Sequence, residues 1–152
     1  MFIPLEKMSD SELRAFFENH KEDLSRLRVL SRVENVAAVT CDWIELDDRR
    51  RLPTTDPNFD HYISKDAFSE ICELIRRLEL DNPVGVGFRG KFSFTVTKVT
   101  FGNVSGGFTQ GVVYLEKPPD DIVSSIDDVP PRRGRYYTLL EGNWYAFHWI
   151  DG

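Results

Sequence analysis

VGVGFRGKFSFTVTKVTFGNVSGGFTQGVVYLE, residues 84–116, is the stretch that decides the predicted fold. Within it, Phe92, Phe94 and Val96 alternate with polar residues, which is the period of two that a half-buried strand requires. The glycines and the asparagine between positions 102 and 107 favour a chain reversal, because these residues tolerate positive φ. A second strand-like run over 108–115 follows at hairpin distance. We therefore expect an antiparallel sheet at the centre of the domain.

The same stretch places Gly85, Gly87 and Gly90 in the spacing GxGxxG. A dinucleotide site needs a strand before these glycines and a helix after them, so that the amino end of the helix meets the pyrophosphate. Here a helical pattern precedes them and an alternating strand follows. We interpret the glycines as part of a turn or bulge in the sheet.

Two amphipathic helices are predicted before this sheet. The first opens at Ser9 or Ser11, and Ser9 has the capping-box spacing to Glu12. The apolar residues of this helix then recur near a 3.6-residue period. Residues 36–46 are predicted to form one strand and 47–62 a long loop. Ser64 is expected to cap the second helix.

The remaining sequence predicts a short helix near 118–126, with Ile122 facing inward, and then a terminal hairpin of 135–140 and 144–150. Residues 1–152 are thus expected to form a single α+β domain. Its two amphipathic N-terminal helices would pack on a mainly antiparallel sheet of five or six strands, with the short helix before the C-terminal hairpin.

Charge and hydropathy narrow the classes of function. The formal net charge of −6 disfavours general nucleic-acid binding, since phosphates require clustered positive charge. The acidic balance favours solubility or a basic partner instead. No apolar run approaches the ~20 residues that cross a bilayer, and the first residues lack the apolar core of a secretory signal. We expect a soluble, cytoplasmic protein without membrane association, and the sequence leaves its oligomeric state open.

Cys41 and Cys72 are the only cysteines, and they lie in separate predicted elements without CxxC spacing. Cysteine is commonly a core residue, and a reducing cytosol disfavours bridges. Two buried free thiols are therefore the main interpretation. A disulfide and a reactive thiol are the alternatives.

Asp56, Asp60 and His61 bring two carboxylates and an imidazole within six positions. Such a group suits a divalent metal or a general base. An aspartate followed by proline and asparagine is also ordinary turn chemistry. We predict structural roles for the three residues and no metal or cofactor. A small metal-dependent hydrolase that uses them is kept as an alternative function.

An arginine cluster, Arg132, Arg133 and Arg135, is a weak candidate for anion binding, because guanidinium groups bind phosphates and carboxylates through paired hydrogen bonds. Asp127 and Asp128 precede it and cancel most of its local field. Solvated arginines are the favoured interpretation.

The terminal strand, WYAFHWI at 144–150, is apolar on both faces, whereas a strand with one wet face alternates. Either helices cover the second face, or an aromatic surface is exposed for a partner. The second hypothesis places Tyr145, Phe147 and Trp149 at the contact.

The function predicted from these features is a non-catalytic protein-binding module, specifically an acidic inhibitor or neutralising partner of another protein. Its binding residues would be the three aromatic residues above together with Asp127 and Asp128. The alternatives are the hydrolase and a small-ligand pocket lined by Tyr136, Tyr145 and Trp149. We lean against an enzyme.

Overall fold

The computed structural model describes residues 7–80, 85–86, 93–103 and 106–151 of the chain. Its strands form two antiparallel sheets, a three-stranded sheet of order β1-β2-β3 and a five-stranded sheet of order β4-β5-β6-β8-β7. The strands are β1 (Val36–Val39), β2 (Trp43–Leu46), β3 (Arg51–Pro53), β4 (Gly85–Val86), β5 (Ser93–Asn103), β6 (Gly106–Leu115), β7 (Gly134–Glu141) and β8 (Trp144–Asp151). The α+β class and the antiparallel pairing are confirmed, but the strands divide into two sheets where one was expected.

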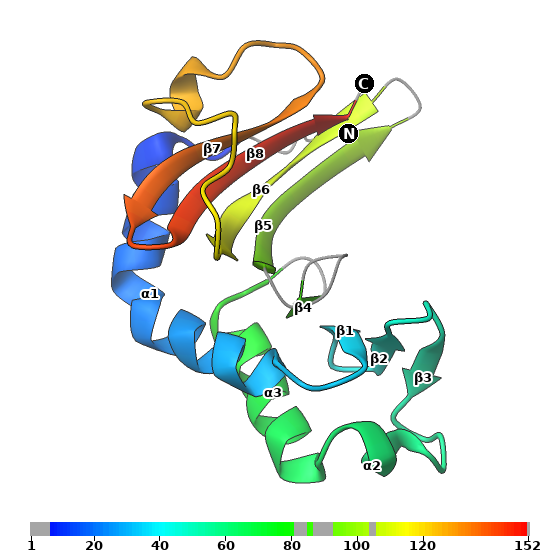
Figure 1. Cartoon of the computed structure of the whole chain (residues 1–152). Helices are drawn as coiled ribbons and strands as arrows, with labels where there is room; N and C mark the ends of the chain where they lie inside the picture. The colour runs from blue at the N-terminus through cyan, green and yellow to red at the C-terminus, as the bar shows by residue number, and fades with distance from the viewer. Residues whose placement is uncertain (1–6, 81–84, 87–92, 104–105, 152) are drawn as a thin grey trace, which may run out of the picture.

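Both predicted helices are present. α1 (Asp10–Ser31) begins with the predicted capping box, in which Glu12 N donates to Ser9 Oγ at 3.2 Å and Ser9 N donates to Glu12 Oε1 at 3.1 Å. α3 (Lys65–Arg77) is capped by the Ser64 hydroxyl, which accepts from Ala67 N. α1 runs from the larger sheet down to α3 and the smaller sheet (Figure 1).

α1 joins the two halves of the core through its apolar face. Near its start, the Phe17 ring lies 5.8 Å from the Trp144 ring of β8. Toward its end, Arg26 pairs with Glu70 of α3 at 2.9 Å. Leu24 and Leu27 of α1 belong to the same buried cluster as residues from both sheets.

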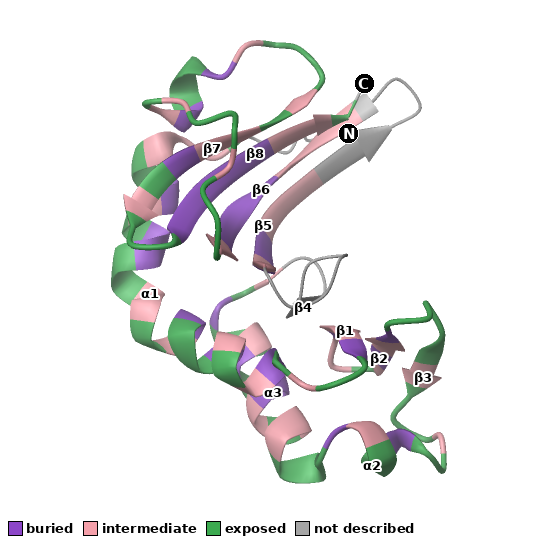
Figure 2. Cartoon of the chain, viewed as in Figure 1, coloured by how far each residue is buried: buried purple, intermediate pink, exposed green. Residues whose placement is uncertain are grey.

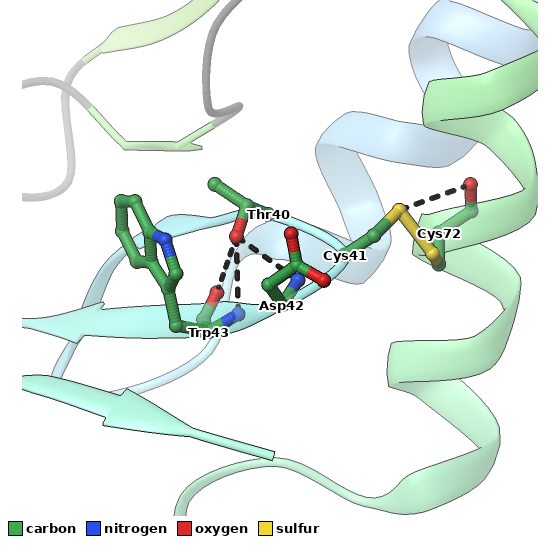
Figure 3. The surroundings of a disulfide bond; sticks show 5 residues. All are labelled: Thr40, Cys41, Asp42, Trp43 and Cys72. Carbon is green, nitrogen blue, oxygen red and sulfur yellow. Dashed lines mark hydrogen bonds between the residues drawn. A yellow bond between two sulfur atoms is a disulfide. The ribbon is translucent and has the colours of Figure 1, made fainter.

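Residues 36–46 form a hairpin, so the prediction of a single strand is wrong. Thr40 causes the reversal, because its Oγ1 accepts hydrogen bonds from Asp42 N at 3.2 Å and Trp43 N at 3.1 Å (Figure 3). A threonine hydroxyl that binds backbone two and three residues ahead stabilises a turn. The β-branched residues at the start of the run favoured a single strand and concealed this turn.

The expected loop at 47–62 contains β3 and a short helix, α2 (Phe59–Tyr62). The chain reverses after β2 through Arg49, whose φ is 72°, and Leu46 N donates to Arg50 O at 2.8 Å. The proline and polar residues thus mark tight turns between short elements.

The expected helix near 118–126 is mostly extended chain. Tyr137 N donates to Asp121 O at 3.0 Å, and Val123 N donates to Tyr137 O at 2.7 Å, so this segment lies along the edge of β7. Ile122 is 50% exposed, contrary to its predicted inward position. Only a 3-10 turn, η1 (Ile126–Asp128), follows.

The central hairpin of β5 and β6 is confirmed, with Phe94 and Val96 buried. Phe92, Gly87 and Gly90 lie outside the described residues. Thr97 is one of the polar residues of the alternating run and would face solvent in that pattern, but it is only 5% exposed. The register shifts between Thr97 and Val99, which disturbs the predicted alternation.

The two cysteines form a disulfide, so the interpretation as free thiols is wrong (Figure 3). Cys41 lies in the β1–β2 turn and Cys72 lies within α3, with their Cα atoms 5.1 Å apart. Their separation of 31 positions carries no motif, and only the packing of the hairpin on the helix brings them together.

Within the described part of the chain, none of the helices combines the length and the apolar character that a membrane span needs.

Candidate functional site

β8 lies between β6 and β7 in the larger sheet. On each face of the sheet, the side chains of β8 therefore have side chains of β6 on one side and side chains of β7 on the other. The face that carries Trp144 and Ala146 packs on α1 and η1, through contacts with Phe17, Leu13 and Ile126. This face supplies part of the core. The helices α1 and η1 therefore lie on one side of the sheet.

The other face of the sheet carries the aromatic residues of the partner-binding hypothesis. Tyr145, Phe147 and Trp149 stand opposite Leu139, Tyr137 and Arg135 of β7, respectively, in the strand register. Val113 and Leu115 of β6 extend the same apolar cluster. We call this surface the aromatic face, defined by Val113, Leu115, Arg135, Tyr137, Leu139, Tyr145, Phe147 and Trp149.

The aromatic face has a buried base and an accessible rim. Phe147 is fully buried and Tyr145 is 5% exposed, so both serve as packing residues within the chain (Figure 2). Trp149 and Tyr137 are half-buried, and Leu139 is 49% exposed. Of the three aromatic residues assigned to a partner contact, the structure leaves Trp149 the most accessible.

Phe147 reaches full burial because the neighbouring strand carries a glycine. A Cβ on Gly111 would lie 3.0 Å from the Phe147 ring and would overlap the Val96 carbonyl oxygen. The absence of a side chain at position 111 therefore makes room for the ring. The Phe147 ring in turn supports Trp149, whose ring centroid lies 4.3 Å away.

Arg135 completes the rim of the aromatic face. Its guanidinium carbon lies 4.6 Å from the centroid of the Trp149 ring, which is a cation–π distance. Arg135 is exposed, so its hydrogen-bonding groups stay available to solvent or to a partner.

Burial raises the pKa of the neighbouring Tyr137 hydroxyl, and the Trp149 and Arg135 side chains partly oppose that shift. Tyr137 is thus held in its neutral, hydrogen-bonding form at physiological pH.

Asp127 and Asp128, the two acidic residues predicted to bind the partner, make different contacts. Asp127 Oδ1 accepts a hydrogen bond from Asp10 N at 3.0 Å, while Asp10 Oδ1 accepts from Ile126 N at 3.0 Å. These bonds tie η1 to the start of α1. Asp127 therefore has a structural role, although it stays exposed, and Asp128 is exposed beside it.

The arginine cluster separates into two kinds of residue. Arg132 and Arg133 are exposed in the loop before β7, and the Arg132 carbonyl accepts from the Tyr136 hydroxyl at 3.2 Å. Arg135 instead stacks on Trp149. The structure gives Arg135 a defined contact with the aromatic face.

Asp56 and Asp60 make two separate local contacts, and neither involves His61. Asp56 Oδ1 accepts from Asn58 N at 2.8 Å, which is the expected turn, and Asp60 pairs with Lys65 at 3.6 Å. His61 is exposed. In the described residues, no group of three or more histidine, cysteine or acidic side chains is placed to hold a metal.

The pocket proposed for a small ligand is not formed by its three predicted residues. Tyr136 pairs with His148 and packs with the helix side of the sheet, whereas Tyr145 and Trp149 lie on the aromatic face. Adjacent residues of a strand point to opposite faces, which is why Tyr136 cannot join the other two. Elsewhere, a hollow of about 230 Å³ lies beside Asp48, Arg50 and Tyr62, which is smaller than typical ligand pockets.

A second tryptophan–arginine pair escaped the sequence analysis. The guanidinium carbon of Arg51 in β3 lies 4.2 Å from the Trp43 ring of β2, and Glu45 pairs with Arg51 at 3.5 Å. Trp43 stands opposite Pro53 and Arg51 stands opposite Glu45, so the two side chains are diagonal neighbours across the β2–β3 hairpin, which was predicted as part of one strand and a loop. Without knowledge of that hairpin, two residues eight positions apart in the sequence were not expected to be in contact.

His148 is buried on the helix side of the sheet. Its ring stacks on Phe108 at 5.4 Å, and its Nδ1 has no hydrogen-bond partner among the residues that the structure describes. Burial, with a smaller contribution from the Lys7 charge, lowers its pKa to about 4. The neutral imidazole is therefore the folded form at physiological pH.

Comparison with known proteins gives no relative: no family model matches the chain, and neither the curated proteins nor the solved structures yield a significant match.

Proposed function

We propose that this protein is a non-catalytic protein-binding module that contacts its partner through the rim of the aromatic face. The observation that carries the proposal is the stack of Arg135 on Trp149, held from below by Phe147. Tryptophan, tyrosine and arginine dominate the residues that contribute most to binding free energy at interfaces. This rim presents one of each, with Tyr137 as the third.

The packing of the rim favours tight association. Phe147 restricts the Trp149 ring before any partner arrives, so binding loses less side-chain entropy. Leu139 and Ile122, both about half exposed, add apolar area on either side of Tyr137. Large exposed apolar groups next to one another mark interaction surfaces more often than isolated ones do.

The charge of the chain suggests the kind of partner. A net charge of −6 favours encounter with a basic protein, and the exposed carboxylates of Asp127 and Asp128 would contribute to that attraction. Such charges act on the association rate more than on the lifetime of the complex. An acidic inhibitor or neutralising partner of a basic protein, in the cytoplasm, is the specific form that we propose.

The test is a comparison of matched tryptophan variants. Partners are recovered from lysate at low salt, and their affinity is then measured for wild type, Trp149→Ala and Trp43→Ala. We expect Trp149→Ala to weaken binding by ~2 kcal/mol or more, about 30-fold, mostly through faster dissociation. Trp43→Ala removes a tryptophan that is also stacked on an arginine, but in the other sheet, and should leave affinity unchanged.

A double variant separates the electrostatic attraction that speeds association from the direct contacts that hold the complex. Asp127→Asn with Asp128→Asn should slow association at low salt and have little effect at high salt, because salt screens the attraction. Asparagine at 127 retains the oxygen that accepts from Asp10 N, so the link to α1 is kept. Equal affinity of wild type and Trp149→Ala, with both variants folded by circular dichroism, would contradict the proposed surface.

A further inference from the structure

The Cys41–Cys72 disulfide joins two elements at positions of unequal access. Cys41 lies in the β1–β2 turn and is half-buried, whereas Cys72 lies on the inner face of α3 and is buried. The greater exposure of Cys41 therefore favours attack of a solvent thiol at this residue. Access decides which sulfur of a disulfide is attacked.

The hairpin packs on the core independently of this bond. Val39 and Ile44, which flank the turn, are fully buried in the same apolar cluster as Ile71 and Leu74 of α3. A chain of 152 residues also builds a core large enough to fold without a covalent link. Both the oxidised and the reduced chain are thus expected to keep the fold, which a reversible device requires.

We propose that Cys41–Cys72 is a reversible redox clasp that fixes the β1–β2 turn to α3 and is opened by a cellular thiol of the glutathione class. The attacking thiolate forms a bond to Cys41 Sγ, the Cys41–Cys72 bond breaks, and Cys72 leaves as a thiolate that takes up a proton. A second thiol then attacks the mixed disulfide and releases Cys41. In sum, two thiols are oxidised to one disulfide, and the protein disulfide is reduced to two thiols.

A reversible disulfide is compatible with the cytoplasmic location that we propose, whereas a permanent one is not. In the cytoplasm, disulfides are transient and serve catalysis or redox sensing, whereas a permanent bond belongs to oxidising compartments. The inference rests on the cytoplasmic location proposed above, but it concerns the small sheet and is independent of the partner surface of β8.

Opening the clasp has a local consequence. In the oxidised form the turn is held by the disulfide and by the Thr40 hydroxyl bonds to Asp42 N and Trp43 N. Reduction leaves only the hydrogen bonds, so the turn opens more often while Val39 and Ile44 stay packed. Amides around the turn should then exchange faster, and those of β6 should not.

The experiment uses the purified chain in glutathione buffers that span oxidising and cytosolic conditions. Thiols are trapped by alkylation and mapped by mass spectrometry, and hydrogen exchange is followed in peptides covering 36–46 and 108–115. We expect reversible reduction, glutathione trapped on Cys41, and a severalfold faster exchange confined to 36–46. A variant with Cys41→Ser and Cys72→Ser should exchange like the reduced chain and be insensitive to glutathione.

Three results would overturn the clasp. The first is free thiols in every buffer, which would remove the bond itself. The second is a bond that survives cytosolic glutathione conditions, or glutathione trapped on Cys72 in place of Cys41. The third is equal exchange at 36–46 in the oxidised and reduced chains, which would show that the bond does not control the turn.

Discussion

The side chain of Gln110 binds both backbone polar groups of Met8, 102 positions earlier in the chain. Met8 N donates to Gln110 Oε1 at 2.7 Å, and Gln110 Nε2 donates to Met8 O at 3.0 Å. Gln110 is fully buried in β6, so these bonds satisfy an amide that has no access to water. They hold the segment before α1 against the larger sheet.

Replacing Gln110 with leucine should therefore destabilise the protein. The change keeps the approximate volume but leaves N and O of the half-buried Met8 without these partners. An unsatisfied polar group costs about 1–3 kcal/mol where it is buried from water. We expect a loss of ~2 kcal/mol or more in the free energy of unfolding, with faster hydrogen exchange at the start of α1. Glu22→Leu on the solvent side of α1 is the control for a polar-to-apolar change, and an equal effect of both variants would contradict the role of Gln110.

Phe94→Ala tests the packing between β5 and the terminal hairpin. Phe94 is buried, and its ring meets the Trp144 ring edge-on at 6.3 Å. Removal of a packed phenylalanine costs about 3–5 kcal/mol through lost burial and the cavity that remains. Val29→Ala, at an exposed position of α1, should change stability by no more than about 0.5 kcal/mol. Chemical denaturation of the two variants measures the difference.

The buried imidazole of His148 predicts a loss of stability in acid. Its pKa in the folded chain is about 4, below the ordinary 6.5, so between these values the unfolded chain binds a proton that the folded chain does not. Above pH 6.5 the imidazole is neutral in both states, so it does not lower the free energy of unfolding. As the pH falls from 6.5 toward 4, protonation of the unfolded chain lowers that free energy by at most ~3 kcal/mol. His148→Phe should reduce this part of the pH dependence of unfolding.

Lys7 offers an independent check on the same group. Its positive charge is the smaller cause of the lowered pKa of His148, after burial. Lys7→Gln should raise that pKa and narrow the pH range over which stability falls, without removing the imidazole. Identical unfolding curves for wild type, Lys7→Gln and His148→Phe from pH 7 to 4 would contradict this account.

Loss of the disulfide should lower stability without unfolding the chain. The bond closes a loop of 31 positions, for which the chain-entropy model gives about 3–4 kcal/mol. A combined Cys41→Ser and Cys72→Ser variant should show a loss of that order by denaturant titration, with an unchanged circular dichroism spectrum. A variant that is unfolded at neutral pH would show instead that the apolar contacts of Val39 and Ile44 do not suffice.

The sequence by itself determined the elements whose signals are local. The capping box of Ser9 and Glu12, the cap at Ser64, the β5–β6 hairpin and the terminal hairpin were all predicted and are present. Each depends on residues a few positions apart, so periodicity and turn chemistry suffice to reveal it. The turn at Thr40 is local as well, but the β-branched residues at the start of this run favoured a single strand and masked it.

Tertiary structure alone decided how these elements meet. The Cys41–Cys72 bond, the Trp149–Arg135 and Trp43–Arg51 stacks and the Gln110–Met8 hydrogen bonds join residues from different elements. Which face of β8 meets α1 was equally undetermined, because the strand is apolar on both sides. Side chains meet across elements according to register and packing, and a single sequence specifies these only through the free energy of the whole folded chain.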